Sequence, residues 1–393
     1  MRGVSADNRQ AAAGGPSGAG AAGPILPSGG AAPGEPALLT RIEREIAGAG
    51  GWLPFDRFMA LALYAPGLGY YANAGAKFGA LPSSGSDFVT APEMTPLFAQ
   101  ALAVQLAQAL RSTGTDEVWE FGAGSGALAA QLLDALDAAA AAPRRYVIVE
   151  LSASLRARQQ QALARHGERV RWCEALPPAI AGVVIGNEVL DAMPVQLLQR
   201  RAGQWLERGV AWAGGAPVFA ERPTPLRPPI EVPGDHDYQT EIAPQAQAFV
   251  RTVGERLQRG AAFFIDYGFP EHEYYHPQRH MGTLACHRAH RVDGDPLSDV
   301  GQKDITAHVD FTAMAVAAQD AGLQVLGYAS QGRFLLNCGL AALLEQATLP
   351  ERIAGQRLLH EHEMGELFKV LALGRGPAWA PLGFAHGDRT HRL

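Results

Sequence analysis

Cysteine is scarce in this chain of 393 residues. The three cysteines, Cys173, Cys286 and Cys338, lie far apart in the sequence and form no C-x-x-C pair. This spacing fits neither a disulfide framework nor a structural zinc site, and we expect no bound metal. Free cysteines at this frequency are typical of a reducing compartment, so a cytoplasmic location is expected.

An excess of basic residues is also missing, since 33 Lys and Arg are outnumbered by 39 Asp and Glu. A nucleic-acid-binding surface is basic, so we expect no nucleic-acid partner. No apolar run approaches the ~20 residues of a membrane helix, and no membrane insertion is expected either. The chain does have 47% hydrophobic residues, which is enough for one large domain with a deep core.

Residues 1–37 lack large apolar side chains almost entirely and consist mostly of Ala, Gly, Pro and Ser. Such a segment cannot bury enough surface to offset its conformational entropy, so we expect a disordered low-complexity tail. It has no continuous apolar stretch of the kind found in signal peptides. Arg2 and Arg9 leave an organellar transit peptide open as an alternative.

Apolar residues at helical spacing predict helices over residues 38–49, 55–63 and 96–110. We interpret residues 38–115 as a helical N-terminal cap that also carries a loop near the cofactor or substrate. Short apolar runs then alternate with helix-length segments over residues 116–375. The seven candidate strands are 117–121, 145–150, 170–173, 183–187, 262–266, 323–328 and 367–373.

This alternation is typical of an α/β fold with a mostly parallel sheet and helices on both faces. Residues 196–243 interrupt it and are interpreted as a hairpin-like insertion. Residues 267–310 are expected to form a loop on the substrate side, and residues 376–393 a C-terminal tail. The histidines between His272 and His290 are interpreted as part of a solvated mobile loop.

The segment VWEFGAGSGAL places Gly122, Gly124 and Gly126 between a predicted strand and a predicted helix. Glycine lets the backbone turn tightly and approach a ligand, and the start of the helix offers unpaired N–H groups. Glu120 lies two residues before Gly122, where its carboxylate can accept a hydrogen bond from the ammonium of a methionine moiety. A phosphate-binding turn has no use for this acid, so we predict an S-adenosylmethionine site.

Two other functions remain open. The same segment satisfies the dinucleotide pattern G-x-G-x-x-G/A with Ala127 in the last position, as in an NAD- or FAD-binding oxidoreductase. Glu150, at the end of the next strand, would hold ribose hydroxyls in either case. The chain could also be a catalytically silent scaffold or assembly factor with a methyltransferase fold, and the glycines alone are compatible with a plain tight turn.

Polar side chains follow the fourth predicted strand in the segment GVVIGNEVLDAMP. Ligands of open α/β sheets lie beyond the carboxyl ends of the strands, so we expect Asn187 beside the cofactor and Glu188 and Asp191 in the reaction site. Two acids three residues apart share one face of a helical turn and could bind a cationic nucleophile. The alternative is a helix cap, in which Asn187 caps the helix and the acids complement its dipole.

The segment ITAHVDF places His308 and Asp310 before the helix predicted over residues 311–321. A histidine at this position could act as a base or donate to a substrate carbonyl, so His308 is a catalytic candidate. The alternative is a side chain that only caps the helix or satisfies a carbonyl of the core.

Together these motifs resemble the MidA-like family of class I S-adenosylmethionine-dependent methyltransferases. That family has a mitochondrial member that is a complex I assembly factor and methylates an arginine side chain. The resemblance covers roughly residues 41–375. The matching stretches are FMALALYAPGLGYY, DFVTAPEMTPLF, VWEFGAGSG, VIVELS, NEVLDAMPV, GTL with DITAHVDF, and MGELFKVLAL.

The resemblance implies a Rossmann-like fold with a seven-stranded, mostly parallel sheet and methyl transfer to an arginine of a protein substrate. It implies a loop near the cofactor that contains Asp87, Thr90 and Glu93. Ser86 separates Gly85 from Asp87, whereas the family tends to place glycine directly before the aspartate, which leaves the role of Asp87 open. The further cofactor-binding residues implied are Glu120, Gly122, Gly124 and Glu150, and the reaction site contains Asn187, Glu188 and Asp191. The substrate protein and the oligomeric state, a homodimer included, are left open.

Overall fold

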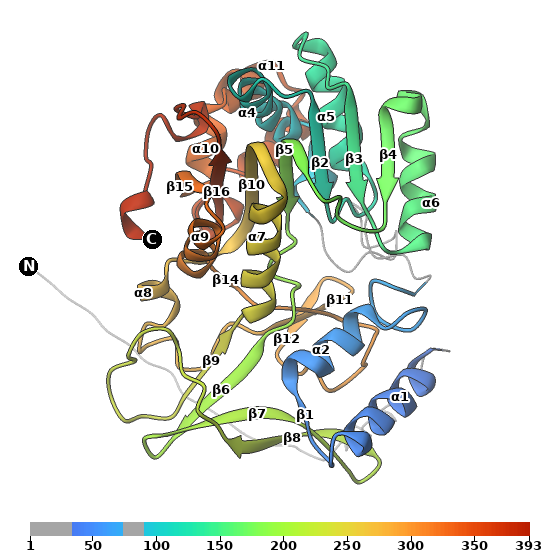
Figure 1. The fold of residues 1–393 in the computed structure, drawn as a ribbon, viewed down its shortest axis with the longest axis vertical. Coiled ribbons are helices and arrows are strands. Elements are labelled where there is room, and N and C mark those ends of the chain that lie inside the picture. The colour runs from blue at the N-terminus through green and yellow to red at the C-terminus, as the bar shows by residue number, and fades with distance from the viewer. Residues whose placement is uncertain (1–33, 74–89) are drawn as a thin grey trace, which may run out of the picture. The chain divides into compact units, whose positions relative to one another are not determined.

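The computed structural model describes residues 34–73 and 90–393 and contains a large mixed sheet, seen in the upper half of Figure 1. Its strands follow the order β15-β16-β10-β5-β2-β3-β4, and β14 pairs with β10 outside this path. Strands β10, β5, β2, β3 and β4 run parallel, while β16 is antiparallel to both β10 and β15. The bounds are β2 (Glu117–Phe121), β3 (Arg145–Val149), β4 (Val170–Cys173), β5 (Ile180–Asn187), β10 (Leu257–Phe269), β14 (Val309–Asp310), β15 (Gln324–Ser330) and β16 (Phe368–Arg375).

The predicted α/β fold is confirmed, and each of the seven predicted strand segments overlaps a strand of this sheet. The eighth strand, β14, has only two residues, which is too short to give an alternating pattern. Neighbouring residues of β10 face opposite sides: Phe263 packs into one apolar cluster and Phe264 into another. The sheet is therefore buried on both faces, as expected of parallel strands.

Helices cover both faces of the sheet. One apolar cluster joins it to α4 (Leu97–Thr113), α5 (Ala127–Ala138) and α10 (Gln331–Asn337). The second joins it to α7 (Pro244–Arg256) and α9 (Phe311–Asp320), which lie in front of the sheet in Figure 1. We expected α4 in an N-terminal cap, but it packs against α5, β5 and β10. Its Ala- and Leu-rich sequence is apolar around most of the helix, as is typical of a helix buried in a core.

A second lobe combines three parts of the chain that are distant in the sequence. It contains α1 (Glu35–Gly48) and α2 (Phe55–Tyr64), a sheet in the order β1-β7-β6-β9 with β8 on β7, and a small sheet in the order β12-β11-β13. One apolar cluster joins them, including Ile42, Phe58, Leu197, Cys286 and Ile305. The bounds are β1 (Leu53–Pro54), β6 (Gln196–Arg201), β7 (Gln204–Ala213), β8 (Ala216–Pro223), β9 (Tyr238–Ile242), β11 (Ala285–Arg288), β12 (Arg291–Asp293) and β13 (Asp304–Thr306).

Segments expected to lack structure are partly ordered. Helix α1 begins at Glu35, inside the expected tail, while residues 1–33 lie outside the described residues. The histidine-rich segment contains α8 (Glu271–Tyr274) and β11, whose Cys286 is fully buried. At the C-terminus, the Arg389 N–H donates to the Tyr328 carbonyl at 2.6 Å, so this segment lies along the edge strand β15.

Shorter helices complete the described chain. They are α3 (Ala91–Met94), α6 (Ala153–Ala162), η2 (Ala164–Arg169), α11 (Leu340–Gln346), α12 (Leu349–Arg357), α13 (Met364–Leu367), η3 (Leu382–Phe384) and η4 (Thr390–Arg392). None of the helices within residues 34–73 and 90–393 has the length and apolar character needed to cross a membrane.

Candidate active site

The glycine turn lies between the end of β2 and the start of α5. Gly122, Gly124 and Gly126 have φ angles of +65°, +52° and +86°, which side-chain-bearing residues rarely adopt. A Cβ atom on Gly122 would lie 2.7 Å from Cγ2 of Val189, in the loop after β5. The turn therefore needs glycine at Gly122 for its backbone conformation and for its close approach to that loop.

Gln159 on α6 connects the glycine turn to Glu150. Its side-chain amide donates to the Gly124 carbonyl and to Oε2 of Glu150, both at 3.0 Å. Its Oε1 accepts from the indole N–H of Trp172 at 3.0 Å, while Ser152 N–H donates to Oε1 of Glu150 at 2.8 Å. Both oxygens of Glu150 are thus fixed in direction. Sequence reasoning missed Gln159, because a glutamine in a polar helix gives no signal of this role.

Glu120 lies in β2 and is only 1% exposed. The Tyr146 hydroxyl donates to Oε2 of Glu120 at 2.7 Å. Burial raises the pKa of Glu120 to about 7; the hydrogen bond from Tyr146 opposes this shift and the charge of Glu150 adds to it. Glu120 is also one of the residues that line the cavity.

Helix α3 lies against the glycine turn and the helix that follows it. The Ser125 hydroxyl donates a hydrogen bond to Glu93, and the Gln131 amide donates to the Pro92 carbonyl at 2.9 Å. Thr90 and Glu93 both line the cavity. Asp87, predicted in the same loop, lies outside the described residues.

The loop after β5 is held by the end of β10. Glu188 has a φ of +53°, and its N–H donates to the Ile265 carbonyl at 2.8 Å. Oδ2 of Asp266 accepts from the N–H groups of residues 189–191 at 3.1, 2.9 and 3.3 Å. Residues 188–195 form bends and turns, so the helix-cap interpretation of Asn187 is wrong. Glu188 has a left-handed backbone conformation, and the N–H groups of residues 189–191 donate to the Asp266 carboxylate. The loop is therefore held by these contacts and not by a helical turn.

Two acidic side chains of this loop, Glu188 and Asp191, line the cavity and have no Lys or Arg ion-pair partner among the described residues. Burial raises the pKa of Glu188 to about 8 and that of Asp191 to about 6, and the charge of Asp191 adds to the shift of Glu188. Asn187 donates to Oε1 of Glu188 at 2.9 Å, while its own buried Oδ1 has no partner among the described residues. These groups are arranged to receive a cation or a hydrogen-bond donor.

Two tyrosines reach the cavity from the second lobe. The rings of Tyr64 and Tyr71 stack with their centroids 5.6 Å apart. The Tyr64 hydroxyl donates to the Ala192 carbonyl at 2.8 Å, and the Tyr71 hydroxyl donates to Oδ2 of Asp304 at 2.8 Å. Both tyrosines and Asp304 line the cavity, which therefore has walls from both parts of the protein.

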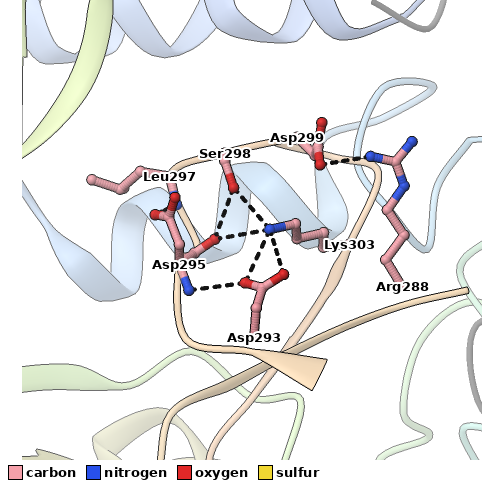
Figure 2. A network of polar contacts seen from close by, with 7 residues as sticks. All are labelled: Arg288, Asp293, Asp295, Leu297, Ser298, Asp299 and Lys303. Atoms are coloured by element: carbon pink, nitrogen blue, oxygen red, sulfur yellow. Dashed lines mark hydrogen bonds and ion pairs between the residues drawn. The ribbon is translucent and has the colours of Figure 1, made fainter. Parts of the chain in front are cut away.

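A buried lysine fixes the loop that leads into Asp304 (Figure 2). Nζ of Lys303 donates to both carboxylate oxygens of Asp293 at 3.0 and 2.8 Å, to the Asp295 carbonyl at 3.2 Å and to the Ser298 hydroxyl at 2.8 Å. Because Asp304 is the next residue in the chain, this network also determines where that carboxylate enters the cavity.

His308 and Asp310 have different surroundings. The His308 ring packs edge-on against Tyr267 and Phe269, with both centroid distances at 5.2 Å, and its buried Nδ1 has no partner among the described residues. Burial lowers its pKa to about 4, so the ring is neutral at pH 7. Asp310 instead caps α9, accepting from Ala313 N–H at 3.1 Å.

The predicted site residues come together around one cavity of about 1130 Å³. Gly126 turns the chain into α5 without lining it. The size suits a cofactor together with an acceptor side chain. The predicted residues that line it are Thr90, Glu93, Glu120, Gly122, Gly124, Glu150, Asn187, Glu188, Asp191 and His308.

Other cavity residues were missed. Tyr64 and Tyr71 come from the second lobe, and nothing in the sequence relates them to the sheet. Tyr267 could have been found, because it is a polar residue near the carboxyl end of a predicted strand, where ligands of such sheets bind. The same holds for Asp266, just before it, which bonds the loop after β5 without lining the cavity.

Comparison with known proteins gives consistent matches. Residues 101–329 match a family model described as "Putative S-adenosyl-L-methionine-dependent methyltransferase". The chain is 52% identical to a protein from Burkholderia thailandensis whose crystal structure is bound to S-adenosyl-homocysteine; the TM-score is 0.90, over 94% of this chain and 100% of that one. It is 28% identical over 375 residues to the mitochondrial protein arginine methyltransferase NDUFAF7 homolog of Drosophila melanogaster, covering 83% of this chain and 82% of that protein.

The mitochondrial protein arginine methyltransferase NDUFAF7 of Homo sapiens is 25% identical, covering 82% of this chain and 80% of that protein. The mitochondrial names of these relatives contradict the cytoplasmic location that we expected from the cysteines. The reason is that free cysteines indicate only that thiols stay reduced, which does not identify the compartment.

Proposed function

Because the chain belongs to the family of S-adenosyl-L-methionine-dependent methyltransferases whose model it matches, we propose that it transfers a methyl group to an arginine side chain of a protein substrate. Family membership gives the fold and the cofactor; the acceptor is the proposed part. The observation that carries it is the pair of acidic side chains, Glu188 and Asp191, which face the cavity without a cation from the described chain. The names of the curated relatives, protein arginine methyltransferases, support it.

The residues around the glycine turn fit S-adenosylmethionine. Gly122 and Gly124, both with positive φ, present backbone without side chains to the cavity, and the fixed oxygens of Glu150 can accept from the hydroxyls of a ribose. The unpaired Oδ1 of Asn187 offers a further acceptor. When bound, the cofactor supplies a methyl group on a positively charged sulfur, which is a good leaving group. The residues that would hold it are Thr90, Glu93, Glu120, Gly122, Gly124, Glu150 and Asn187.

Glu188 and Asp191 would bind the guanidinium group of the acceptor. A guanidinium presents its N–H donors in one plane, so two carboxylates can orient it and expose one nitrogen for the transfer. Its positive charge also offsets the repulsion between the two acids and favours their ionised forms. Holding the nucleophile in line in this way is worth several kcal/mol of the barrier.

The transfer releases one proton, because the acceptor nitrogen forms a bond to the methyl carbon and loses an N–H proton. The methylated guanidinium therefore keeps a single positive charge. Glu188 is the proposed proton acceptor, since its pKa of about 8 is the higher of the two acids in the ligand-free site. Neutral His308 would serve as a hydrogen-bond partner of the substrate and not as a charged group.

The proposal is tested by following a methyl label. The protein is incubated with methyl-labelled S-adenosylmethionine and a protein extract, and the labelled proteins are hydrolysed to amino acids. We expect the label in methylated arginine, and expect Glu188→Gln to bind S-adenosyl-homocysteine normally while losing the transfer. Label in lysine, glutamine or a small molecule would overturn the arginine acceptor while leaving the family intact.

A further inference from the structure

The end of strand β10 accepts hydrogen bonds from the N–H groups of residues 188–191, in the loop after β5. We infer that Asp266 is the positioning residue of the acceptor site: its carboxylate holds residues 189–191 so that Glu188 and Asp191 face the cavity, and its charge helps to attract a cation there. The inference rests on the proposed function, in which those two acids bind the acceptor.

Asp266 is a buried carboxylate surrounded by N–H donors. It is 1% exposed, Oδ2 accepts from three successive N–H groups of residues 189–191, and Oδ1 accepts from Tyr267 N–H at 3.0 Å. A protonated carboxyl would direct its own O–H at a donor, so this arrangement favours the charged form.

The contacts from β10 fix the loop along its whole length. Glu188 donates its N–H to the Ile265 carbonyl at 2.8 Å and takes the left-handed conformation that a side chain disfavours. The Asp191 carbonyl accepts from Ala307 N–H at 2.9 Å, just after β13. Asp266 holds the residues between these two points, so its loss releases the middle of the loop.

Tyr267 acts on the side chain of the same loop. Its buried phenol forms a hydrogen bond with the Asp191 carboxylate, which lowers the pKa of Asp191 against the effect of burial. Two adjacent residues of β10 therefore act on this loop. Asp266 holds its backbone, and Tyr267 orients the side chain of Asp191.

The charges near Asp266 are almost all negative or neutral. Burial and the charges of Asp191 and Glu188 raise its pKa, whereas its backbone N–H donors act in the opposite direction. Lys369, its neighbour in register on β16, directs its ammonium to the carbonyls of Glu366 and Leu367. The titratable groups of this cluster are Glu188 and Asp191 on the loop, Tyr267 on β10 and Asp304 on β13, whose charge acts on Glu188.

The test compares Asp266→Asn with the wild type for cofactor binding and for labelling of arginine in a protein extract. We expect nearly normal affinity for S-adenosyl-homocysteine but a loss of transfer of about 100-fold, the effect of a reacting group displaced by about 1 Å. Removing the charge of Asp266 also lowers the pKa of Glu188 and Asp191. The acid limb of the rate–pH profile should therefore move to lower pH, which a purely structural role would not cause.

Two more variants make the result decisive. Tyr267→Phe removes one hydrogen bond to Asp191 and should lower transfer about tenfold with cofactor binding intact. Glu117→Gln is the matched control, because Glu117 is a buried carboxylate at the far end of β2 that pairs with Arg144 and Arg145; it should keep wild-type transfer.

The inference is overturned if Asp266→Asn keeps wild-type transfer, keeps the wild-type acid limb, or loses cofactor binding together with transfer. If Asp266→Asn does not fold, wild-type transfer by Tyr267→Phe overturns it. If the wild-type protein labels lysine, the arginine proposal fails but the inference about Asp266 does not. The same variants can then be compared by their labelling of lysine.

Discussion

The side-chain amide of Gln159 holds the Glu150 carboxylate at 3.0 Å. The same amide nitrogen holds the Gly124 carbonyl, so one buried side chain sets the distance between the glycine turn and the acid that would receive the ribose. Gln159 therefore positions two groups of the predicted cofactor site.

Gln159→Leu should weaken binding of S-adenosyl-homocysteine about tenfold, because Glu150 loses a buried hydrogen bond worth about 1 kcal/mol and its fixed direction. Calorimetry measures the effect. Trp172→Phe is the control, since it removes only the indole donor to Gln159 and leaves both amide hydrogen bonds in place. Equal affinities for wild type and Gln159→Leu would show that Glu150 needs no support.

Gly122→Ala should abolish detectable binding of S-adenosyl-homocysteine. Its Cβ would lie 2.7 Å from Val189, and its φ of +65° costs a side-chain-bearing residue about 1–2 kcal/mol. Gly114→Ala is the matched control: its φ is +61°, but nothing lies within 4 Å of the added Cβ. It should lower stability by about 1 kcal/mol and leave binding unchanged. Normal binding by folded Gly122→Ala would rule out this turn as the cofactor site.

The stability of the ligand-free protein should fall as pH rises from about 5 to about 8, partly through Glu188. Its pKa in the folded protein is about 8, above its ordinary value of 4.5, so the folded state binds the proton more tightly. The stabilisation that comes from the tighter binding of this proton in the folded protein is complete below pH 4.5 and is lost as pH approaches 8. Glu188→Gln cannot titrate and should show a smaller decrease in Tm over this range, and an unchanged decrease would contradict the prediction.

Lys303→Met should lower the free energy of unfolding by about 2 kcal/mol, because the hydrogen bonds of a buried ammonium are lost. It should also raise the KM for the acceptor, since Asp304 is the next residue, with little effect on cofactor affinity. Arg288→Ala is the control on the same loop: it removes the exposed ion pair with Asp299 (Figure 2), which is worth less than about 1 kcal/mol. Equal KM values for the two variants would show that the Lys303 network does not affect binding of the acceptor.

The sequence predicts the sheet well because its strands are buried on both faces and appear as short apolar runs, such as Val183, Val184 and Ile185. The glycine turn and the acids after β5 are predictable for a related reason. Each is contiguous in the sequence, and the strand before it determines where it lies.

The remaining features depend on contacts between distant segments. The conformation of residues 189–191 is set by Asp266, at least 75 residues later, and the helical turn that local spacing favours is replaced by hydrogen bonds to that carboxylate. Likewise, Tyr71 meets Asp304 only because the second lobe brings α1, α2 and β13 together. Periodicity within one segment carries no information about such pairs.

The second lobe combines segments that are distant in the sequence, and this affects how the chain folds during its synthesis. Helices α1 and α2 emerge from the ribosome well before their packing partners: Leu53, just before α2, pairs with Val210, and Gly301 packs beside Leu38. The apolar faces of these helices must therefore remain without their native contacts while more than half of the protein is translated. Contacts of such long sequence separation form slowly, and exposed apolar surface promotes aggregation meanwhile. The nascent chain should accordingly depend on chaperones until residues near 305 have been made.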